Sequence, residues 1–365
     1  MVLSSPSEKI QTEKFQKEAI QLLKALIRIP SYSLEEKKTG DLLEHFLLRK
    51  KVQTFRKGNN VWAFNKHFQS HLPTILLNSH HDTVKPNSSY MRDPFDPVVS
   101  SGKLFGLGSN DAGGALVSLM AAFLYFHDTK NMDFNLAYAA TAEEEISGMG
   151  GIESILDQLG NLTCAIVGEP TGMQMAVAEK GLLVIDCIAK GKAGHAARDE
   201  GENALYLAQD DIHWFRNFRF PKTSPWLGPV KMSVTMIEAG MQHNMVPGTC
   251  HFTVDIRLNE CYSHGEILNT LRQHIKSEVH ARSERLGPSF IPEDHPLVQA
   301  GKKLGLSSYG SPTTSDQALL HIPSMKLGPG DSARSHTADE YIWLEEIREG
   351  IDIYIRLLKQ LLKIN

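Results

Sequence analysis

The sequence predicts an α/β protein in which helices surround a mixed sheet and a smaller α+β domain interrupts the main one. Apolar runs of strand length alternate with amphipathic helices over residues 1–173, which is typical of layered α/β domains. Residues 174–284 follow a different order, and residues 285–365 return to the first pattern. A chain of 365 residues is long enough for two domains. We therefore expect both ends of the chain to form one domain, with residues 174–284 inserted.

The composition gives no electrostatic reason to expect a nucleic-acid or anionic-membrane partner, since the net charge is only −4. The longest apolar stretch, Ala112–Phe126, is too short to span a bilayer, and residues 1–11 are polar and lack an apolar signal core. The cysteines form no CxxC pair, which favours a reducing compartment and argues against a thiolate zinc site. We expect a cytoplasmic protein with no membrane partner.

The first domain begins with two predicted helices. Residues 12–29 carry apolar side chains at helical spacing until Pro30 ends the helix, and a second helix is expected near Lys38–Lys51. The apolar runs Val61–Asn65 and Thr74–Leu77 are predicted to be strands. Helices and strands that alternate in this way favour a layered arrangement.

The second of these strands leads into a His-x-Asp pattern formed by His80 and Asp82. Residues two apart on a strand point to the same side, so both side chains face one spot. Histidine is the commonest metal ligand, and a carboxylate on its other ring nitrogen fixes its tautomer. The pattern indicates a metal ligand, His80, with an orienting partner, Asp82. A surface His–Asp pair at a strand end is the more common origin of this pattern taken alone.

A glycine-rich segment, Gly106–Gly114, follows a loop-rich region at residues 86–105 and precedes a helix that ends near Phe126. It differs from a dinucleotide fingerprint, because Asp111 occupies the third glycine position and no strand is expected to enter directly. Glycines around one carboxylate indicate a tight backbone that directs Asp111 into a crowded site. An ordinary loop before a helix is an equally good interpretation of this segment alone.

Acidic residues follow two further predicted strands. Three glutamates at residues 143–145 come after the strand Asn135–Thr141, and Glu169 follows the strand Ala165–Gly168. Acids at such positions commonly start a solvated helix, because carboxylates suit a helix N-terminus. Here, however, the strands bring them to the same sheet edge as His80, and this edge is where open α/β sheets bind ligands.

The inserted region is predicted to be a compact ferredoxin-like unit, because its order is strand, helix, strand, strand, helix, with room for a final strand. His195 lies in the loop after the first strand. Such a unit exposes a sheet edge and a helix face that can pair with a second copy. The predicted elements are Leu182–Ala189, Asn203–Phe218, Val230–Glu238, Thr249–Arg257 and His264–His280.

The last third of the chain is predicted to contain a helix at Leu297–Leu304, a short strand at Ser324–Leu327 and a C-terminal helix. A glycine-containing loop follows the strand and carries His336. One face of the C-terminal helix is expected to be buried, because apolar residues form a stripe along it: Ile347, Ile351, Ile355, Leu358 and Leu362.

Side chains from these separate segments form one candidate metal site: His80, Asp82, Asp111, Glu144, Glu145, Glu169 and His336. Two imidazoles with several carboxylates suit zinc, with manganese or cobalt as alternatives. Their number exceeds the ligands of one tetrahedral site, which indicates two metal ions that share a carboxylate. Such a pair lowers the pKa of a bound water to about 7, and a free carboxylate beside it can take the proton.

Taken together and in order, the motifs make the sequence similar to the M20 metallohydrolases, which include acetylornithine deacetylase, succinyl-diaminopimelate desuccinylase, aminoacylases and carboxypeptidases. The resemblance covers nearly the whole chain. It is carried by Ser79-His80-His81-Asp82-Thr83-Val84, Gly106-Leu107-Gly108-Ser109-Asn110-Asp111, Thr141-Ala142-Glu143-Glu144-Glu145, Gly168-Glu169-Pro170-Thr171, Gly194-His195-Ala196, and Gly328-Pro329-Gly330 with His336-Thr337.

The resemblance implies how the candidates would divide between two metal ions. Asp111 would bridge both ions. One ion would add His80 and Glu169, and the other would add Glu145 and His336. The implied metal is zinc, with cobalt as an alternative.

The resemblance further implies that Glu144 is the general base and that Asp82 orients His80. The inserted domain would act as a lid and as the interface of a homodimer. His195 would then reach the site of the partner subunit and stabilise the tetrahedral oxyanion, as oxyanion donors do in other enzymes. Without the resemblance, a turn histidine before a helix would be the favoured interpretation of His195.

Substrate contacts are implied at Lys180, Asn244, Arg257 and Thr314. Arg257 is fit to clamp a carboxylate through two hydrogen bonds, although a salt bridge at a strand end explains it equally well. Lys180 stands where the desuccinylase branch tends to carry arginine, which argues against that substrate. Leu107, where many members carry arginine, agrees better with the acetylornithine branch.

We therefore expect a dinuclear metal enzyme that hydrolyses the amide bond of an N-acyl-L-amino acid. N-acetylornithine, in arginine biosynthesis, is the favoured substrate. The alternatives within the family are N-acyl-citrulline deacylation, succinyl-diaminopimelate desuccinylation and dipeptide hydrolysis. A non-catalytic metal-binding scaffold is the rival from another class, and the presence of Glu144 argues against it.

Overall fold

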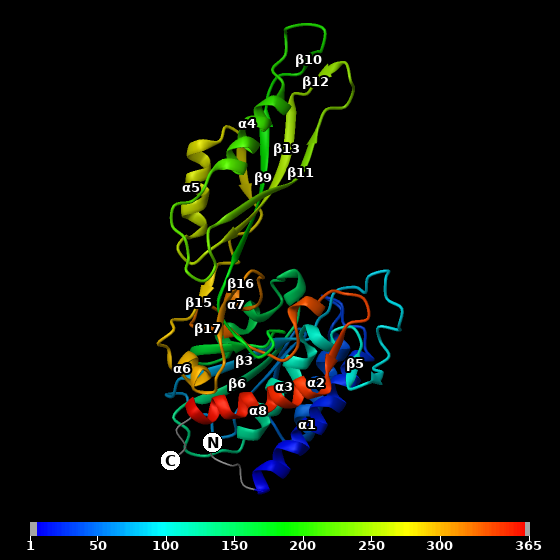
Figure 1. Cartoon of the computed structure of the whole chain (residues 1–365), viewed down its shortest axis with the longest axis vertical. Coiled ribbons are helices and arrows are strands. Elements are labelled where there is room, and N and C mark those ends of the chain that lie inside the picture. The colour runs from blue at the N-terminus through cyan, green and yellow to red at the C-terminus, as the bar shows by residue number, and fades with distance from the viewer. Residues whose placement is uncertain (1–5, 362–365) are drawn as a thin grey trace. The chain divides into compact units, whose positions relative to one another are not determined.

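The structure is a computed structural model that describes residues 6–361 (Figure 1). The described chain divides into two compact units. The first comprises the chain up to Val177, Ile291–Tyr309 and the chain from Ser315 onward, whereas the second comprises Ala178–Phe290 and Gly310–Thr314. The first unit is thus assembled from stretches that are far apart in the sequence. Both units mix helices and strands, so the predicted α/β class is confirmed.

A mixed sheet forms the centre of the first unit. In spatial order its strands are β1 (Thr54–Lys57), β2 (Asn60–Phe64), β6 (Asn135–Thr141), β3 (Thr74–His80), β7 (Leu162–Val167), β17 (Ser324–Lys326) and β8 (Met175–Glu179). The central strands β6, β3, β7 and β17 run parallel, and β1, β2 and β8 run antiparallel to their neighbours. β3 and β6 are buried along their whole length, as expected for strands covered on both faces.

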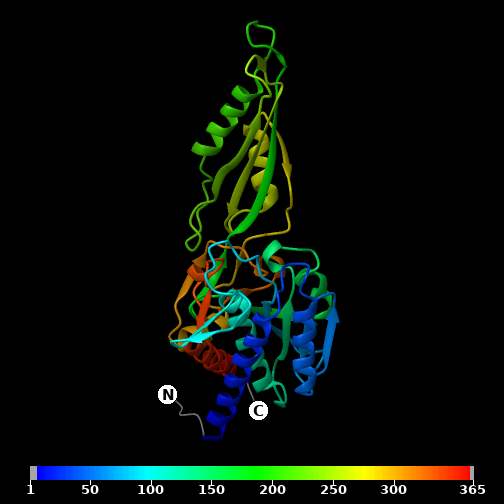
Figure 2. The ribbon, with the colours of Figure 1, turned by 90° about the vertical axis from the view of Figure 1, so that its right-hand side faces the viewer.

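Helices pack around this sheet (Figure 2). The apolar helix α3 (Gly114–Phe126) lies against β3 and β6, and it contacts α1 (Pro6–Ile27) and α8 (Leu344–Leu361) on its other side. The predicted stripe of α8 is buried from Ile347 to Leu358, while Leu362 lies outside the described residues. The remaining helices of this unit are α2 (Lys37–Arg49), α6 (Pro296–Lys303) and α7 (Gln317–Leu320).

The predicted loop at residues 86–105 is partly wrong, because it contains β4 (Val99–Ser100) and β5 (Lys103–Phe105). A strand therefore does enter the glycine-rich segment directly. It belongs to a small antiparallel sheet, in which β5 pairs with β18 (Tyr341–Trp343), and not to the parallel sheet of a nucleotide-binding unit. Strands of two or three residues are too short to show a period in the sequence.

The second unit is a four-stranded antiparallel sheet with two helices on one face (Figure 1). The sheet order is β11-β13-β9-β14, the order of the predicted ferredoxin-like unit with its final strand. One core joins the inward-facing side chains of the strands with both helices. The elements are β9 (Gly181–Lys190), α4 (Ala204–Asn217), β11 (Lys231–Ala239), β13 (Thr249–Leu258), α5 (His264–His274) and β14 (Glu278–Ala281).

The predicted helix His264–His280 is too long, since α5 ends at His274 and the chain continues as a strand. The buried Asp211 carboxylate explains the change. It accepts the backbone N–H groups of Lys276 and Ser277 at 3.1 and 2.8 Å. These amides are thereby drawn out of a helical hydrogen-bond pattern.

The remaining short strands form a separate pair in the second unit and add two strands to the nine-stranded mixed sheet. β10 (Gly194–His195) pairs with β12 (Met245–Val246), and β15 (Ser289–Phe290) pairs with the last two residues of β8. β16 (Ser308–Ser311) also pairs with β8. Within the described chain, no helix combines the length and hydropathy needed to cross a bilayer.

Candidate metal centre

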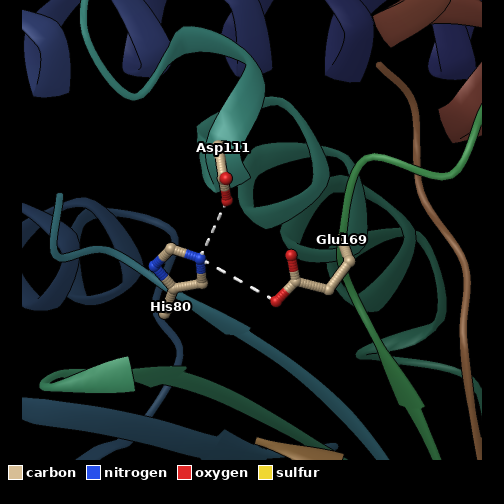
Figure 3. A group of neighbouring side chains, drawn as sticks. All are labelled: His80, Asp111 and Glu169. Carbon is tan, nitrogen blue, oxygen red and sulfur yellow. Dashed lines mark hydrogen bonds and ion pairs between the residues drawn. The ribbon is translucent and has the colours of Figure 1, made fainter. Parts of the chain in front are cut away.

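The carboxyl ends of the parallel strands bring the first group of candidate ligands together (Figure 3). His80 is the last residue of β3, and Glu169 follows β7. His80 Nε2 lies 3.3 Å from Asp111 Oδ1 and 3.8 Å from Glu169 Oε1. The glutamate that follows β6, Glu144, places Oε2 at 3.8 Å from the same nitrogen. One ring nitrogen thus faces three carboxylates.

A second group forms on the other side of Asp111. His336 Nε2 lies 3.0 Å from Glu145 Oε2 and 3.7 Å from Asp111 Oδ2. In each group, one ligand atom from every member lies within 4.8 Å of the others. Asp111 belongs to both groups, and its two oxygens face different imidazoles. The arrangement is that of two adjacent sites with one shared carboxylate.

Asp82 has a wider role than the sequence predicts. Its carbonyl oxygen lies 3.0 Å from His80 Nδ1, closer than its carboxylate oxygen at 3.4 Å. The carboxylate instead accepts the backbone N–H groups of Glu144 and Glu145, each at 3.1 Å, and the hydroxyl of Ser33 at 2.7 Å. Asp82 therefore orients the imidazole mainly through its backbone and fixes the turn that carries both glutamates.

The electrostatics of the first group suit a bound cation. Glu169 Oε1 is buried and forms no hydrogen bond with the described residues. Burial, reinforced by the charge of Asp111, raises the pKa of Glu169 to about 8. Burial and the neighbouring carboxylates likewise raise the pKa of Glu144 well above its usual value. Carboxylates crowded around imidazoles are the donor set that zinc, cobalt and manganese accept.

The nearby carboxylates also raise the pKa of both imidazoles. Burial alone would lower the pKa of His80, but the surrounding carboxylates, led by Glu144, raise it above its usual value. The hydrogen bond to Glu145 raises the pKa of His336 to about 9. Both rings must lose a proton to ligate a metal, so a cation and a proton compete for each nitrogen.

Two carboxylates that the sequence analysis did not identify accept backbone N–H groups of the turns that carry the candidate ligands. The fully buried Glu36 accepts the N–H of Glu143 at 3.2 Å, and Glu340 accepts backbone N–H groups of the segment that carries Asp111. A contact from a side chain to a distant backbone leaves no local sequence pattern. The only available signal is an acidic residue next to a short apolar strand, as Glu340 is next to β18.

His195 and Asn244 lie together at one end of the second unit, where β10 pairs with β12. The backbone carbonyl of Asn244 accepts the N–H of Ala196 at 3.0 Å. His195 is exposed, and its Nδ1 accepts the N–H of Ala197 at 3.1 Å. A neutral imidazole that accepts at Nδ1 carries its proton on Nε2, so this ring presents an N–H donor to its surroundings.

Lys180, Arg257 and Thr314 meet at the opposite end of the same unit, beyond the other end of β9. Arg257 contacts the carboxylate of Asp255 at 2.9 and 3.0 Å, so the salt bridge anticipated as an alternative is present. Thr314 Oγ1 donates to the Lys180 carbonyl at 3.1 Å. The ten-residue strand β9 separates this group from His195, which corresponds to about 33 Å.

Comparisons with known proteins agree with this geometry. A model of the peptidase family M20/M25/M40 matches residues 76–360. Acetylornithine deacetylase of Proteus mirabilis is 27% identical over 366 residues, which cover 90% of this chain and 94% of that protein. Succinyl-diaminopimelate desuccinylase 2 of Ruegeria sp. is 23% identical over 377 residues, which cover 93% of this chain and 94% of that protein.

The fold is also similar to crystal structures of low sequence identity. Aminopeptidase PepT from Bacillus cereus superposes with a TM-score of 0.76 at 18% identity, and the match covers 95% of this chain and 98% of that one. The YXEP protein of Bacillus subtilis, described as a dinuclear metal binding peptidase, gives a TM-score of 0.72 at 14% identity, over 96% and 99% of the two chains.

Proposed function

The chain belongs to the peptidase family M20/M25/M40 and is a hydrolase of that family, and from this premise we propose that it deacylates an N-acyl-L-amino acid. The observation that carries the proposal is the pair of ligand groups that share Asp111. Two divalent metal ions, zinc or cobalt, would fit this pair. When bound, they would polarise the amide carbonyl and acidify a water molecule.

In this proposal each ligand group binds one metal ion. Asp111 would bridge the two ions, His80 and Glu169 would complete one site, and Glu145 and His336 would complete the other. The lone buried oxygen of Glu169 and the short distances within each group support this division. Each group has one imidazole and two carboxylates, and three protein ligands would leave the fourth position of a tetrahedral metal for water or substrate.

Glu144 acts as the general base. Its Oε2 lies 3.8 Å from His80 Nε2, yet it belongs to neither ligand group, so its carboxylate is free to take a proton from water and pass it to a leaving amine. Asp82 supports this function, because it holds the backbone N–H of Glu144 in place. The base is thereby fixed relative to His80, the ligand that Asp82 also orients.

The enzyme acts as a homodimer through the second unit, and His195 serves the partner's site. Its N–H donor at Nε2 suits an oxyanion. Lys180 and Thr314 lie about 33 Å from His195 along β9. One small substrate therefore cannot contact His195 and these residues in the same subunit. The edge strand β11 offers an interface, since Met236 and Ile237 are 63% and 56% exposed.

N-acetylornithine is the proposed substrate. The relatives bear the names of both a deacetylase and a desuccinylase, so they support the reaction class more than the acyl group. Lys180, Asn244, Arg257 and Thr314 are the proposed substrate contacts, and Lys180 and Arg257 are the cations that would meet a substrate carboxylate. Arg257 is also paired with Asp255 at 2.9 Å. A desuccinylase, an N-acyl-citrulline deacylase and a dipeptidase are the alternatives.

The test is a substrate panel with the metal-reconstituted protein. The panel contains the N-acetyl and N-succinyl derivatives of ornithine, citrulline and diaminopimelate, together with a dipeptide, and chromatography measures the amino acid released. We expect the highest kcat/KM for N-acetylornithine. Cleavage of the dipeptide alone would identify a dipeptidase. Two bound metal ions with no hydrolysis of any substrate would indicate a scaffold.

A further inference from the structure

Glu340 is a buried carboxylate, 2% exposed, for which the proposed reaction has no use. It lies between His336 and β18. Its carboxylate accepts three backbone N–H groups, from Asn110 at 2.8 Å, Asp111 at 3.0 Å and Gly108 at 3.2 Å. Both carboxylate oxygens are used, since Oε1 accepts from Asn110 and Asp111 while Oε2 accepts from Gly108.

The backbone of Glu340 is tied to the same segment. Its carbonyl oxygen accepts the N–H of Gly106 at 3.0 Å, and the next residue, Tyr341, pairs with Phe105 in the small sheet. Residues 105, 106, 108, 110 and 111 are therefore each held by Glu340 or its neighbour Tyr341. The same stretch of chain carries His336, a member of the second ligand group.

The segment needs an external support because it is not helical where Asp111 sits. Asp111 has φ −116° and ψ 100°, which places its N–H outside the pattern of the following helix α3. Gly108 has φ +72°, and a Cβ there would lie 2.6 Å from a methyl carbon of Thr83. A buried backbone N–H requires an acceptor, and Glu340 provides one for three such groups.

We infer that Glu340 is a positioning residue that holds Asp111 where its two oxygens can serve both ligand groups at once. The inference rests on the proposed dinuclear site. Asp111 Oδ1 and Oδ2 approach different imidazoles, so a small rotation or shift of its backbone would improve one contact and weaken the other. Residues that orient ligands in this way affect metal affinity or activity by about 10–100-fold when they are replaced.

The experiment is Glu340→Gln with cobalt as the probe. Glutamine keeps the size of the side chain, but its NH2 group must face one of the three N–H donors, so at least one hydrogen bond is lost. We expect the second cobalt ion to bind at least ~10-fold more weakly and the visible spectrum of bound cobalt to change. Titration of the metal-free protein, followed by absorption, measures both quantities.

Asp211→Asn is the matched control. Asp211 is also a buried carboxylate, 4% exposed, that accepts two backbone N–H groups, but it lies in the second unit among no candidate ligands. The control should lower the melting temperature and leave the cobalt spectrum and affinity unchanged. If Glu340→Gln behaves in the same way, its role is purely structural and the inference is wrong, although the proposed function stands.

Two further measurements cover a Glu340→Gln protein that does not fold. Glu340→Asp keeps the charge but withdraws the carboxylate by one methylene, and a wild-type cobalt spectrum from the folded variant would overturn the inference. Rapid hydrogen exchange of the Asn110 and Asp111 amides in the wild-type protein would overturn it as well. If the wild-type protein binds fewer than two cobalt ions, the proposed function fails first and the inference fails with it.

Discussion

The side chain of Glu144 lies 3.8 Å from His80 Nε2, and its backbone N–H is held by Asp82. A glutamine at this position keeps the shape of the side chain but cannot accept a proton. We therefore expect Glu144→Gln to lower kcat by at least ~10²-fold, the size expected for a general base, while the metal content stays unchanged. Steady-state kinetics and elemental analysis on the same sample measure both. Full activity would contradict the role of Glu144.

His336 is the only imidazole of its ligand group. His336→Ala should therefore reduce the bound metal from two ions to one per chain. In the wild-type protein, a proton on this ring competes with the metal, since the pKa of His336 is raised to about 9. The affinity of the second ion should fall as the pH drops below 9, because the protonated fraction of the ring grows. Two tightly bound ions in the alanine variant would show that His336 is not a ligand.

For single residues, the sequence identifies the candidate metal ligands but not the side chains that position them. His80, Asp111 and Glu169 follow strands or glycines in recognisable patterns, and the structure brings them together. Glu340 and Glu36 could not be predicted, because their partners are backbone N–H groups far away in the sequence. Arg257 shows the opposite case, since its partner Asp255 lies two residues away and the salt bridge was foreseeable.

Among the elements, the C-terminal helix α8 packs its apolar stripe against α3, the helix that follows Asp111. Ile351 on this stripe is fully buried. Ile351→Ala should lower the free energy of unfolding by about 2–5 kcal/mol through lost burial and a residual cavity. Urea denaturation of the metal-free protein measures the change.

The exposed residue Glu349, on the same helix, gives the matched control. Glu349→Ala should change the free energy of unfolding by no more than about 0.5 kcal/mol. Equal effects of the two substitutions would show that the stripe does not form the contact with α3.

Whether a helix or strand could be predicted from the sequence depended on its length and on the periodicity of its apolar residues. The helices α2 and α4 and the buried strands β3 and β6 were predicted to within three residues, because their patterns extend over a whole element, whereas α1 begins six residues before the predicted start at residue 12. β5 and β18 have three residues each and exist through their pairing with each other. Strand β14 was predicted as helix because the carboxylate that diverts the chain, Asp211, stands on another element.

At the scale of the whole molecule, the proposed homodimer can be tested by mixing inactive subunits. His195→Ala should lose about 10²–10³-fold in kcat, the size found for one oxyanion donor, with its metals intact. In a mixed dimer with Glu144→Gln, the site that keeps Glu144 receives His195 from the other subunit. Random exchange of equal amounts should therefore restore about a quarter of the wild-type activity.

Two controls define the outcome of this mixing experiment. Each variant alone sets the background, and native mass spectrometry of a tagged subunit shows whether exchange has occurred. Activity that stays at background after confirmed exchange would mean that His195 works within its own subunit or has no role in catalysis. The proposed deacylase reaction would be unaffected by that result.

The position of β17 has a consequence for how the protein is made. β17 lies in the sheet between β7, which ends at Val167, and β8, yet its own residues begin at Ser324. At a synthesis rate of roughly 5–20 residues per second, β17 is synthesised on the order of ten seconds after β7. The continuous stretch Ala178–Phe290 emerges in the meantime. During that interval, the nascent chain presents an open strand edge that other chains can pair with, so it depends on rapid completion or on chaperones.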